Sequence, residues 1–329
     1  MEIGKLSSKI LKEIIMNPIN SNEKKRSEVI LGPNIGEDCS IIDLNNELFI
    51  VSTDPITAAN KNAGYLAVHI NCNDIASSGG EPIGILLTIL LPKNTDKFIL
   101  EYLMNGIYKA TNELNIEILG GHTEVTESVN KPIISATIIG KSNNKKVILS
   151  SGAEVGQKII MTKWAGLEGT TIISNDYYDK LLNYIDKEIL ETSINMSNFI
   201  SVLPESRIAM NYNVTCMHDV TEGGIFGALW EVAECSNKGM IIYKEKIPVK
   251  YETKEVCKFF NINPYRLISS GSMIITTFEA EELVNELRNK GIEANIIGKI
   301  VEKDRYIISN NSKELLLASD MDEIYKIKL

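Results

Sequence analysis

Acidic side chains recur beside glycines and at the ends of predicted strands, where α/β proteins build their sites. Asp38 stands close to Gly36, Asp54 comes directly after an apolar run, and Asn73-Asp74 lies in a helical stretch. Hard carboxylate oxygens suit a Mg²⁺ ion that bridges to phosphate oxygens. Each aspartate, taken singly, also fits a turn, a helix cap or a solvated helix position. The residues by themselves therefore indicate a metal–phosphate site without establishing it.

Two glycine-containing motifs add candidates for anion binding and proton transfer. The first is Gly120-Gly121-His122-Thr123-Glu124, in which the glycines allow a phosphate close to the backbone, and His122 and Glu124 are candidates for a proton relay or a metal ligand. The second places Asp219, Thr221 and Gly223 at a predicted helix start, an arrangement that binds anions or metal phosphates. A β-turn and a capped helix are the purely structural alternatives.

Several other kinds of site are excluded by missing motifs. The sequence has no GxxxxGK[ST] loop and no GxGxxG fingerprint, which argues against P-loop and Rossmann nucleotide sites. It has three histidines, none in HxH or HExxH spacing, and no GxSxG elbow. Zinc hydrolase and serine hydrolase interpretations are therefore weak.

Composition bounds the class of protein. A chain of 329 residues is longer than a single hydrophobic core usually supports, which suggests two domains. Its composition, 44% hydrophobic and 23% charged residues, is typical of a globular protein. A net charge of −9 disfavours nucleic acid and anionic membranes as partners. The longest strongly apolar run, residues 83–91, is too short to span a membrane. Five scattered cysteines and a start without a signal peptide predict a cytoplasmic protein with reduced thiols.

Hydrophobic periodicity predicts mixed α/β structure in two domains. A short helix carries the apolar stripe Ile10, Leu11, Ile14 and Ile15 and ends before Pro18. Polar turns near residues 142–152 place a domain boundary near 150, giving domains 1–150 and 151–329. In the first domain we predict strands over 48–53, 83–91, 116–119 and 133–139 and helices over 65–77 and 100–114. In the second we predict strands over 158–162, 239–243, 272–277 and 294–301 and helices over 167–174, 187–202, 225–235 and 279–290.

The order of the motifs resembles the aminoimidazole ribonucleotide (AIR) synthetase superfamily, which includes PurM, HypE, selenophosphate synthetase and thiamine-monophosphate kinase. The resemblance covers nearly the whole chain and is carried by five segments in the same order: 36–38, 52–55, 73–82, 120–124 and 218–224. The opening Gly4-Lys5-Leu6 and the run 162–170 look most like HypE-like proteins.

This resemblance implies a two-domain PurM-like fold whose N-terminal domain pairs with its copy into a β-barrel homodimer. It implies ATP in the cleft and Mg²⁺ held by Asp38, Asp54, Asp74 and Asp219, with catalysis involving Asp54, Asp219 and His122. It also implies cofactor contacts from a further set: Asn73, Gly120, Gly121, Thr123, Glu124, Thr221 and Gly223. A small-molecule substrate and a maturation partner protein are the expected partners.

The chain also departs from the members it resembles. No cysteine follows Cys257, so we expect it to lack the terminal thiol that HypE uses for dehydration. Glu222 stands where HypE has Arg, and His122 where it has Asp. Three hypotheses follow: a HypE-like Mg–ATP-dependent enzyme with an unidentified substrate, a small-molecule kinase like thiamine-monophosphate kinase, and a non-catalytic nucleotide-binding scaffold for hydrogenase or cofactor maturation.

Overall fold

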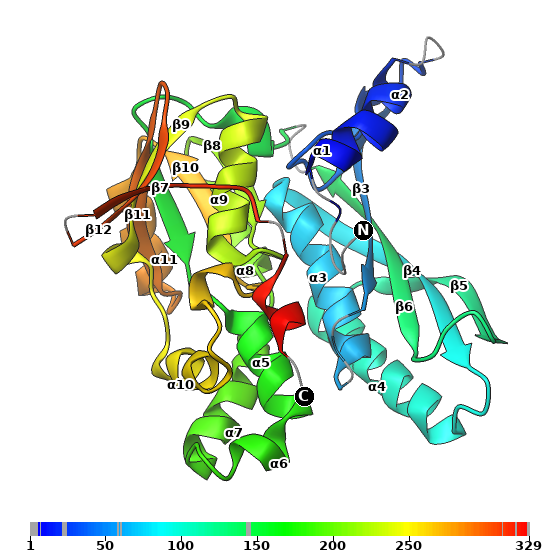
Figure 1. The fold of residues 1–329 in the computed structure, drawn as a ribbon. Coiled ribbons are helices and arrows are strands. Elements are labelled where there is room, and N and C mark those ends of the chain that lie inside the picture. Colours follow the sequence, from blue (N-terminus) through cyan, green and yellow to red (C-terminus); the bar gives the residue numbers. More distant parts are fainter. Residues whose placement is uncertain are drawn as a thin grey trace.

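A computed structural model shows two β-sheets, each built from one half of the chain (Figure 1). The structure describes residues 6, 8–21, 25–57, 59, 61–142, 146–310, 312–319 and 321–327. The opening Gly4-Lys5 of the family resemblance lies outside these residues. Within them, no strand from one side of residue 150 enters the sheet of the other side.

The N-terminal sheet is mainly antiparallel. Its strands lie in the order β1 (Val29–Leu31), β2 (Ser40–Leu44), β3 (Glu47–Ile56), β6 (Ile133–Ser142), β4 (Gly80–Pro92) and β5 (Glu117–Thr126). β4 and β5 pair in parallel, so β5 forms one edge of the sheet. The helix α3 (Ala63–Ser77) lies against β3, β4 and β6, and α4 (Lys97–Leu114) packs beside α3. The amphipathic pattern of α4 explains this position, because its buried residues fall on one face.

The C-terminal sheet has seven strands, with β8 at one edge. The strand order is β13 (Ser312–Leu315), β12 (Arg305–Ser309), β9 (Gly239–Tyr243), β11 (Ala294–Val301), β7 (Lys158–Thr162), β10 (Met273–Thr277) and β8 (Val214–Asp219). Its longer helices are α5 (Leu167–Asp176), α7 (Lys187–Asn195), α8 (Leu203–Ala209), α9 (Gly224–Cys235), α10 (Tyr251–Phe260) and α11 (Ala280–Asn289). After β13, the chain returns toward the N-terminal half (Figure 1), and Ile324 packs in an apolar cluster with Ile173 of α5.

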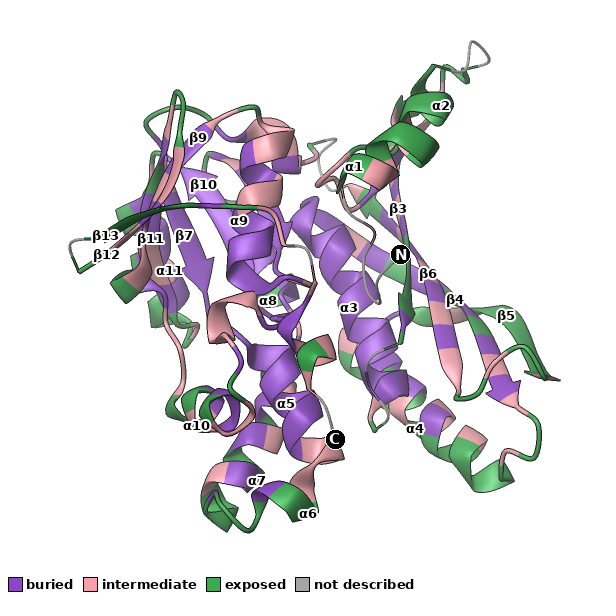
Figure 2. Ribbon diagram, viewed as in Figure 1, coloured by how far each residue is buried: buried purple, intermediate pink, exposed green. Residues whose placement is uncertain are grey.

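Helix α3 joins the two halves. It contacts α8 and β8 as well as its own sheet, and every one of its residues is buried (Figure 2). The side chain of Asn73, on this helix, donates to the carbonyl of Ile200 at 2.8 Å and accepts from the N–H of Val202 at 2.9 Å. A single apolar cluster includes residues from both halves, such as Ile75 and Met217. The two halves are therefore packed around one shared helix.

Two local expectations are wrong. The N-terminal helical segment continues past Pro18, because α2 (Asn17–Asn20) accommodates this proline in its first turn, where a missing N–H costs no intrahelical bond. The predicted turn at Gly120-Gly121 is instead the middle of β5, which runs on to Thr126. A Cβ on Gly121 would lie 1.9 Å from the carbonyl oxygen of Leu87, so glycine lets β5 approach β4 closely.

The expected fold class and most predicted elements are confirmed. The predicted strands and most predicted helices are present with shifted ends, but the helix predicted over 187–202 ends at Asn195 and continues as the short 3-10 stretch Met196–Phe199. The architecture is the mixed α/β type expected from the sequence. Within the described part of the chain, no helix is both long and apolar enough for a membrane span.

Replacing Asn73 by Ala should destabilise the protein. The change leaves the buried carbonyl of Ile200 and the N–H of Val202 without their partner, at a cost of about 1–3 kcal/mol for each group. The free energy of unfolding, measured by urea denaturation, should fall accordingly, whereas Asn105→Ala at an exposed site on α4 serves as control. Equal stability of the Asn73 variant and the wild type would show that Asn73 does not hold the halves together.

Candidate functional site

A cleft of about 1020 Å³ lies between the two halves and is large enough for a nucleotide. The N-terminal half contributes residues 33–40, part of β3 and two positions of α3. The C-terminal half contributes residues 221–223, the start of α5 and the returning segment 318–325. The walls therefore come from segments that are distant in the sequence.

The structure brings three of the four predicted metal ligands to this cleft and buries the fourth, Asp219, near them. Asp38 precedes β2, Asp54 lies on β3, Asp74 lies on α3, and Asp219 ends β8. Asp38, Asp54 and Asp74 line the cleft, and Asp219 is buried within electrostatic reach of Asp38 and Asp54. The hydroxyl of Ser52 links two of them, since it donates to Oδ2 of Asp74 at 2.6 Å and lies 2.9 Å from the carbonyl of Asp38.

These carboxyl groups repel one another. Burial, followed by the charges of Asp219, Asp54 and Asp38, raises the pKa of Asp74 well above its usual range. Burial and the charge of Asp38 raise the pKa of Asp219 to about 8, although the neighbouring His218 lowers it. Both carboxylate oxygens of Asp219 lack a hydrogen-bond partner among the described residues. Buried carboxylates in this state need a cation or a proton.

The donor set fits Mg²⁺ that is shared with phosphate. Among the described residues, no three His, Cys, Asp or Glu side chains converge closely enough to hold a metal ion alone. Mg²⁺ is usually held by one or two carboxylates, several waters and the phosphates of a substrate. The orphaned oxygens of Asp219 and the repulsion around Asp74 match such a partly completed site.

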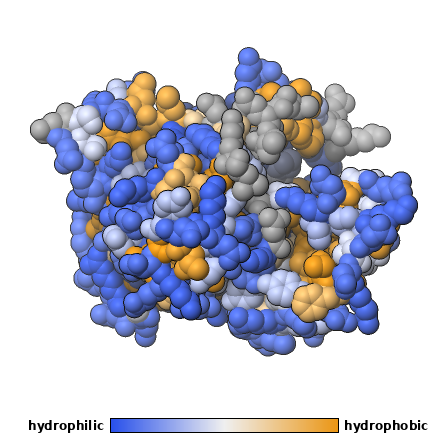
Figure 3. All heavy atoms as spheres, turned by 60° about the horizontal axis from the view of Figure 1, so that its bottom comes forward, coloured by the Kyte–Doolittle hydropathy of each residue, from blue (hydrophilic) through white to orange (hydrophobic). Residues whose placement is uncertain are grey.

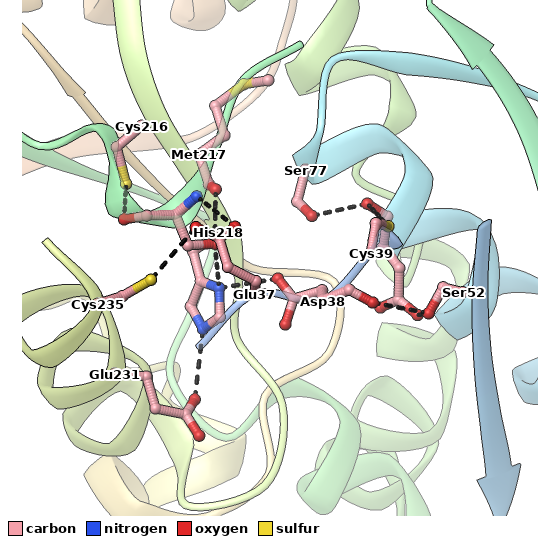
Figure 4. A network of polar contacts seen from close by, with 12 residues as sticks. Glu37, Asp38, Cys39, Ser52, Ser77, Cys216, Met217, His218, Glu231 and Cys235 are labelled. Atoms are coloured by element: carbon pink, nitrogen blue, oxygen red, sulfur yellow. Dashed lines mark hydrogen bonds and ion pairs between the residues drawn. The ribbon is translucent and has the colours of Figure 1, made fainter. Parts of the chain in front are cut away.

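His218 supplies a buried positive charge beside the aspartates (Figure 4). Its Nδ1 lies 2.8 Å from Oδ2 of Asp38, and its Nε2 lies 3.3 Å from Oε2 of Glu231 on α9. Burial lowers the pKa of His218, but the charge of Asp38 and hydrogen bonds to both carboxylates outweigh burial and raise the pKa well above its usual range. The imidazolium therefore persists at neutral pH and fixes the position of Asp38.

Glu37 anchors the segment that carries Asp38 to the other half of the chain. Its two carboxylate oxygens accept from the backbone N–H groups of Ser150 and Ser151, each at 3.1 Å. The thiol of Cys235 lies 3.3 Å from the same side chain (Figure 4). The Gly-Glu-Asp motif thus combines a structural glutamate with a cleft-lining aspartate.

The first glycine motif does not reach this cleft within one chain. Gly120, Gly121, His122, Thr123 and Glu124 are exposed on β5, at the sheet edge opposite β1. The side chain of His122 is 65% exposed and lies 3.2 Å from Glu124. Because β4 and β6 separate β5 from β3, which carries Asp54, any role for these residues at the phosphates stays a prediction that needs a second chain.

Of the three other predicted cofactor contacts, two line the cleft and one does not. Thr221 and Gly223 line the cleft as expected, and Gly223 adopts φ +85° and donates its N–H to Asp322 at 2.6 Å. Asn73 does not line the cleft, because its amide is occupied by Ile200 and Val202. The expected cofactor contact of Asn73 is therefore replaced by a contact between the halves.

The sequence analysis missed several cleft residues. His218 and Glu37 adjoin residues that it selected, so their proximity in the motifs was a usable signal. Glu168 lies at the start of a helix and Ser270 in a serine-rich loop. No sequence motif shows that either side chain lines the cleft. Asp322 lies more than a hundred residues after Asp219, and no sequence pattern connects them.

Two family models match the chain. The model of the AIR synthase related protein N-terminal domain matches residues 36–142, and the model of its C-terminal domain matches residues 154–309. The chain belongs to the AIR synthase related family. The two-domain fold expected from the resemblance is thereby confirmed for this AIR synthase related protein.

Curated relatives match this AIR synthase related protein over most of its length. A putative hydrogenase expression/formation protein of Methanocaldococcus jannaschii is 26% identical over 316 residues, covering 93% of this chain and 90% of the relative. A thiamine-monophosphate kinase of Pyrococcus horikoshii is 26% identical over 292 residues, covering 85% and 87%.

Solved structures show the same fold. The HypE–HypF complex matches with a TM-score of 0.75 and 18% identity, covering 93% of this chain and 100% of the other. HypE in complex with ATP matches with a TM-score of 0.72 and 21% identity, covering 98% and 97%. With a kinase among the relatives, the expectation of an ATP-dependent enzyme is confirmed at the level of the family.

Replacing Asp219 by Asn should stabilise the metal-free AIR synthase related protein. The amide removes a buried carboxylate that repels Asp38 and Asp54, a cost that grows as the pH rises from the ordinary pKa of 3.8 to about 8 and is complete above that value. In EDTA at pH 9, the melting temperature should rise by roughly 2–4 °C for each kcal/mol gained. Asp179→Asn, at an exposed position on α6 (Tyr178–Leu181), is the matched control. A lower melting temperature would contradict the repulsion inferred for this site.

Proposed function

We propose that this chain is a HypE-like enzyme that binds Mg–ATP in the cleft and activates or phosphorylates an unidentified small molecule or a protein-borne group. The observation that carries the proposal is the pair of buried carboxyl groups, Asp74 and Asp219, which repel each other and the more exposed Asp38 and Asp54. Such a pair is costly unless a cation completes it, and ATP brings Mg²⁺ with its phosphates.

The proposal assigns roles to the four predicted metal ligands and to two of the predicted cofactor contacts. Asp38, Asp54, Asp74 and Asp219 would hold Mg²⁺, which neutralises phosphate charge when bound. Thr221 and Gly223, at the start of α9, would lie beside the phosphates. His218 orients Asp38 through the 2.8 Å ion pair, so a metal ligand is already in place before nucleotide enters.

We further propose a homodimer that uses the edge strand β5. Against the mostly hydrophilic surface seen in Figure 3, β4 and β5 expose large apolar side chains: Ile83, Leu86, Leu119 and Val125, which are 40%, 38%, 47% and 63% exposed. An exposed edge strand with apolar neighbours favours pairing with a second copy. Pairing there would bring His122 and Glu124 toward another chain, where the catalytic role predicted for His122 can be met.

The match to thiamine-monophosphate kinase keeps a small-molecule kinase as the second candidate. A kinase would transfer phosphate to its product, whereas a HypE-like enzyme would release phosphate from ATP. The fold shared with the HypE–HypF complex supports a maturation partner protein. We place the activity in the cytoplasm, where the five free thiols stay reduced.

Calorimetric titration of Mg–ATP should show saturable binding to the wild type and none to Asp54→Asn. The substitution removes a carboxylate that faces the cleft, and with it one of the charges that attract the cation. Asp179→Asn should bind like the wild type. Absence of binding by the wild type at millimolar Mg–ATP would overturn the enzyme proposal and favour the scaffold hypothesis.

Replacing Val125 by Asp should convert the proposed dimer into monomers. The valine is 63% exposed on β5, and a charge at a desolvated interface opposes association. Sedimentation velocity on both proteins measures the change, and Val155→Asp, 42% exposed outside either sheet, is the control. A wild type that sediments as a monomer at high micromolar concentration would rule out this interface.

A further inference from the structure

The C-terminal half contributes a second polar wall to the cleft, distinct from the four aspartates. Glu168, in the first turn of α5, and Ser270, just before β10, both line the cleft. They are 2% and 0% exposed, and Asp322 beside them is 3% exposed. Glu222 completes the wall from the loop before α9. We call these four residues the acidic wall.

Two atoms of the acidic wall have no hydrogen-bond partner among the described residues: Oε2 of Glu168 and Oγ of Ser270. Ser270 nevertheless lies next to the Glu168 carboxyl, because hydrogen bonding from its hydroxyl and its backbone N–H lowers the pKa of Glu168 and offsets part of the effect of burial. Buried polar atoms in folded proteins nearly always have partners. Two neighbouring exceptions that face one cleft point to a ligand that supplies the missing partner.

The other members of the acidic wall are already engaged. Asp322 accepts from the N–H groups of Gly223 at 2.6 Å and Ile324 at 2.9 Å. Glu222 accepts from the hydroxyl of Tyr325 at 2.8 Å. Glu168 is therefore the member of the wall whose carboxylate oxygen has capacity left for a ligand.

The charge of the wall limits what this ligand can be. Burial, followed by the charges of Asp322 and Glu222, raises the pKa of Glu168 to about 7. The one basic residue among the described lining of the cleft is Lys131, whose Nζ donates to the carbonyl of Thr57. Phosphate would be repelled here, whereas a group that carries hydrogen-bond donors and positive charge would be attracted.

We propose that Glu168 and Ser270 form the subsite for the second substrate, and that this substrate presents a cationic, hydrogen-bond-donating nitrogen group of the amine or amidine class. The inference rests on the proposed function, in which the aspartates hold the phosphates. It assigns the two walls of the cleft to two ligands of opposite charge. The nucleotide lies against the aspartates through its cation, and the second substrate lies against Glu168.

Three probes of the same shape test the subsite: acetamidine, acetamide and acetate. They differ in that acetamidine only donates and is cationic, acetamide both donates and accepts, and acetate only accepts and is anionic. Ligand-observed NMR titration of the full chain at pH 8 measures their affinities. Acetamidine should bind at least about tenfold more tightly than acetate, because charge-assisted hydrogen bonds are the stronger ones. Equal affinities for acetamidine and acetate would overturn the proposal.

Substitutions at Glu168 and Ser270 test whether acetamidine binds at the proposed subsite. Glu168→Gln should weaken acetamidine about tenfold or more, and Ser270→Ala should weaken it less, while Mg–ATP binding is kept in both. Glu188→Gln, an exposed change of the same kind on α7, should alter neither. Unchanged acetamidine binding in folded Glu168→Gln, or displacement of acetamidine by Mg²⁺ without nucleotide, would overturn the subsite. If Glu168→Gln does not fold, the Ser270→Ala result decides.

The pH dependence of acetamidine binding is a further test of the subsite. Since the pKa of Glu168 is raised to about 7, beside Asp322, Glu222 and Ser270, its carboxylate is lost as the pH falls below that value. Acetamidine binding to the wild type should therefore weaken from pH 8 to pH 6, and a flat profile would count against Glu168 as its contact. Loss of Mg–ATP binding by the wild type, with acetamidine still bound, would instead defeat the proposed function and leave the subsite standing.

Discussion

The rest of the structure depends on the repulsion among four aspartates, two of them buried, and on the scaffold that withstands it. Asp38, Asp54, Asp74 and Asp219 come from separate segments of the two halves, and the buried Asp74 and Asp219 would be more stable in water. They stay together because α3 is buried on every side and is tied to the other half through Asn73. The packing free energy of the fold thus holds a charge arrangement that only a cation completes.

His218 and Glu37 have different roles beside these aspartates. His218 offsets part of the negative charge and orients Asp38, and Glu231 holds the other side of the same ring. Glu37 binds backbone N–H groups at residues 150 and 151, so the segment carrying Asp38 is fixed to the junction between the halves. The position of Asp38 therefore depends on the backbone at residues 150 and 151.

The cleft has two negatively charged sides that suit different ligands. The side with the four aspartates has charges close enough to share a divalent cation. The acidic wall has atoms at Glu168 and Ser270 without a hydrogen-bond partner among the described residues. Because both sides are negative, the proposed phosphate needs its metal to bind, whereas the proposed cationic group needs none. Under our proposals, this difference separates the two substrates by charge.

The sequence by itself determined the α/β class, most helices and strands, the family, and the motifs that carry the four aspartates, because periodicity and glycine-flanked acids are local signals. It could not show that Gly120-Gly121 lies within β5, that Asn73 is occupied by Ile200 and Val202, or that Glu168, Ser270 and Asp322 meet. Those facts depend on contacts between residues far apart in the sequence, from 34 positions for Leu87 and Gly121 to 127 positions for Asn73 and Ile200. Only the tertiary structure decides them, because packing of the two halves around α3 sets which side chains share the cleft and which remain on an outer edge.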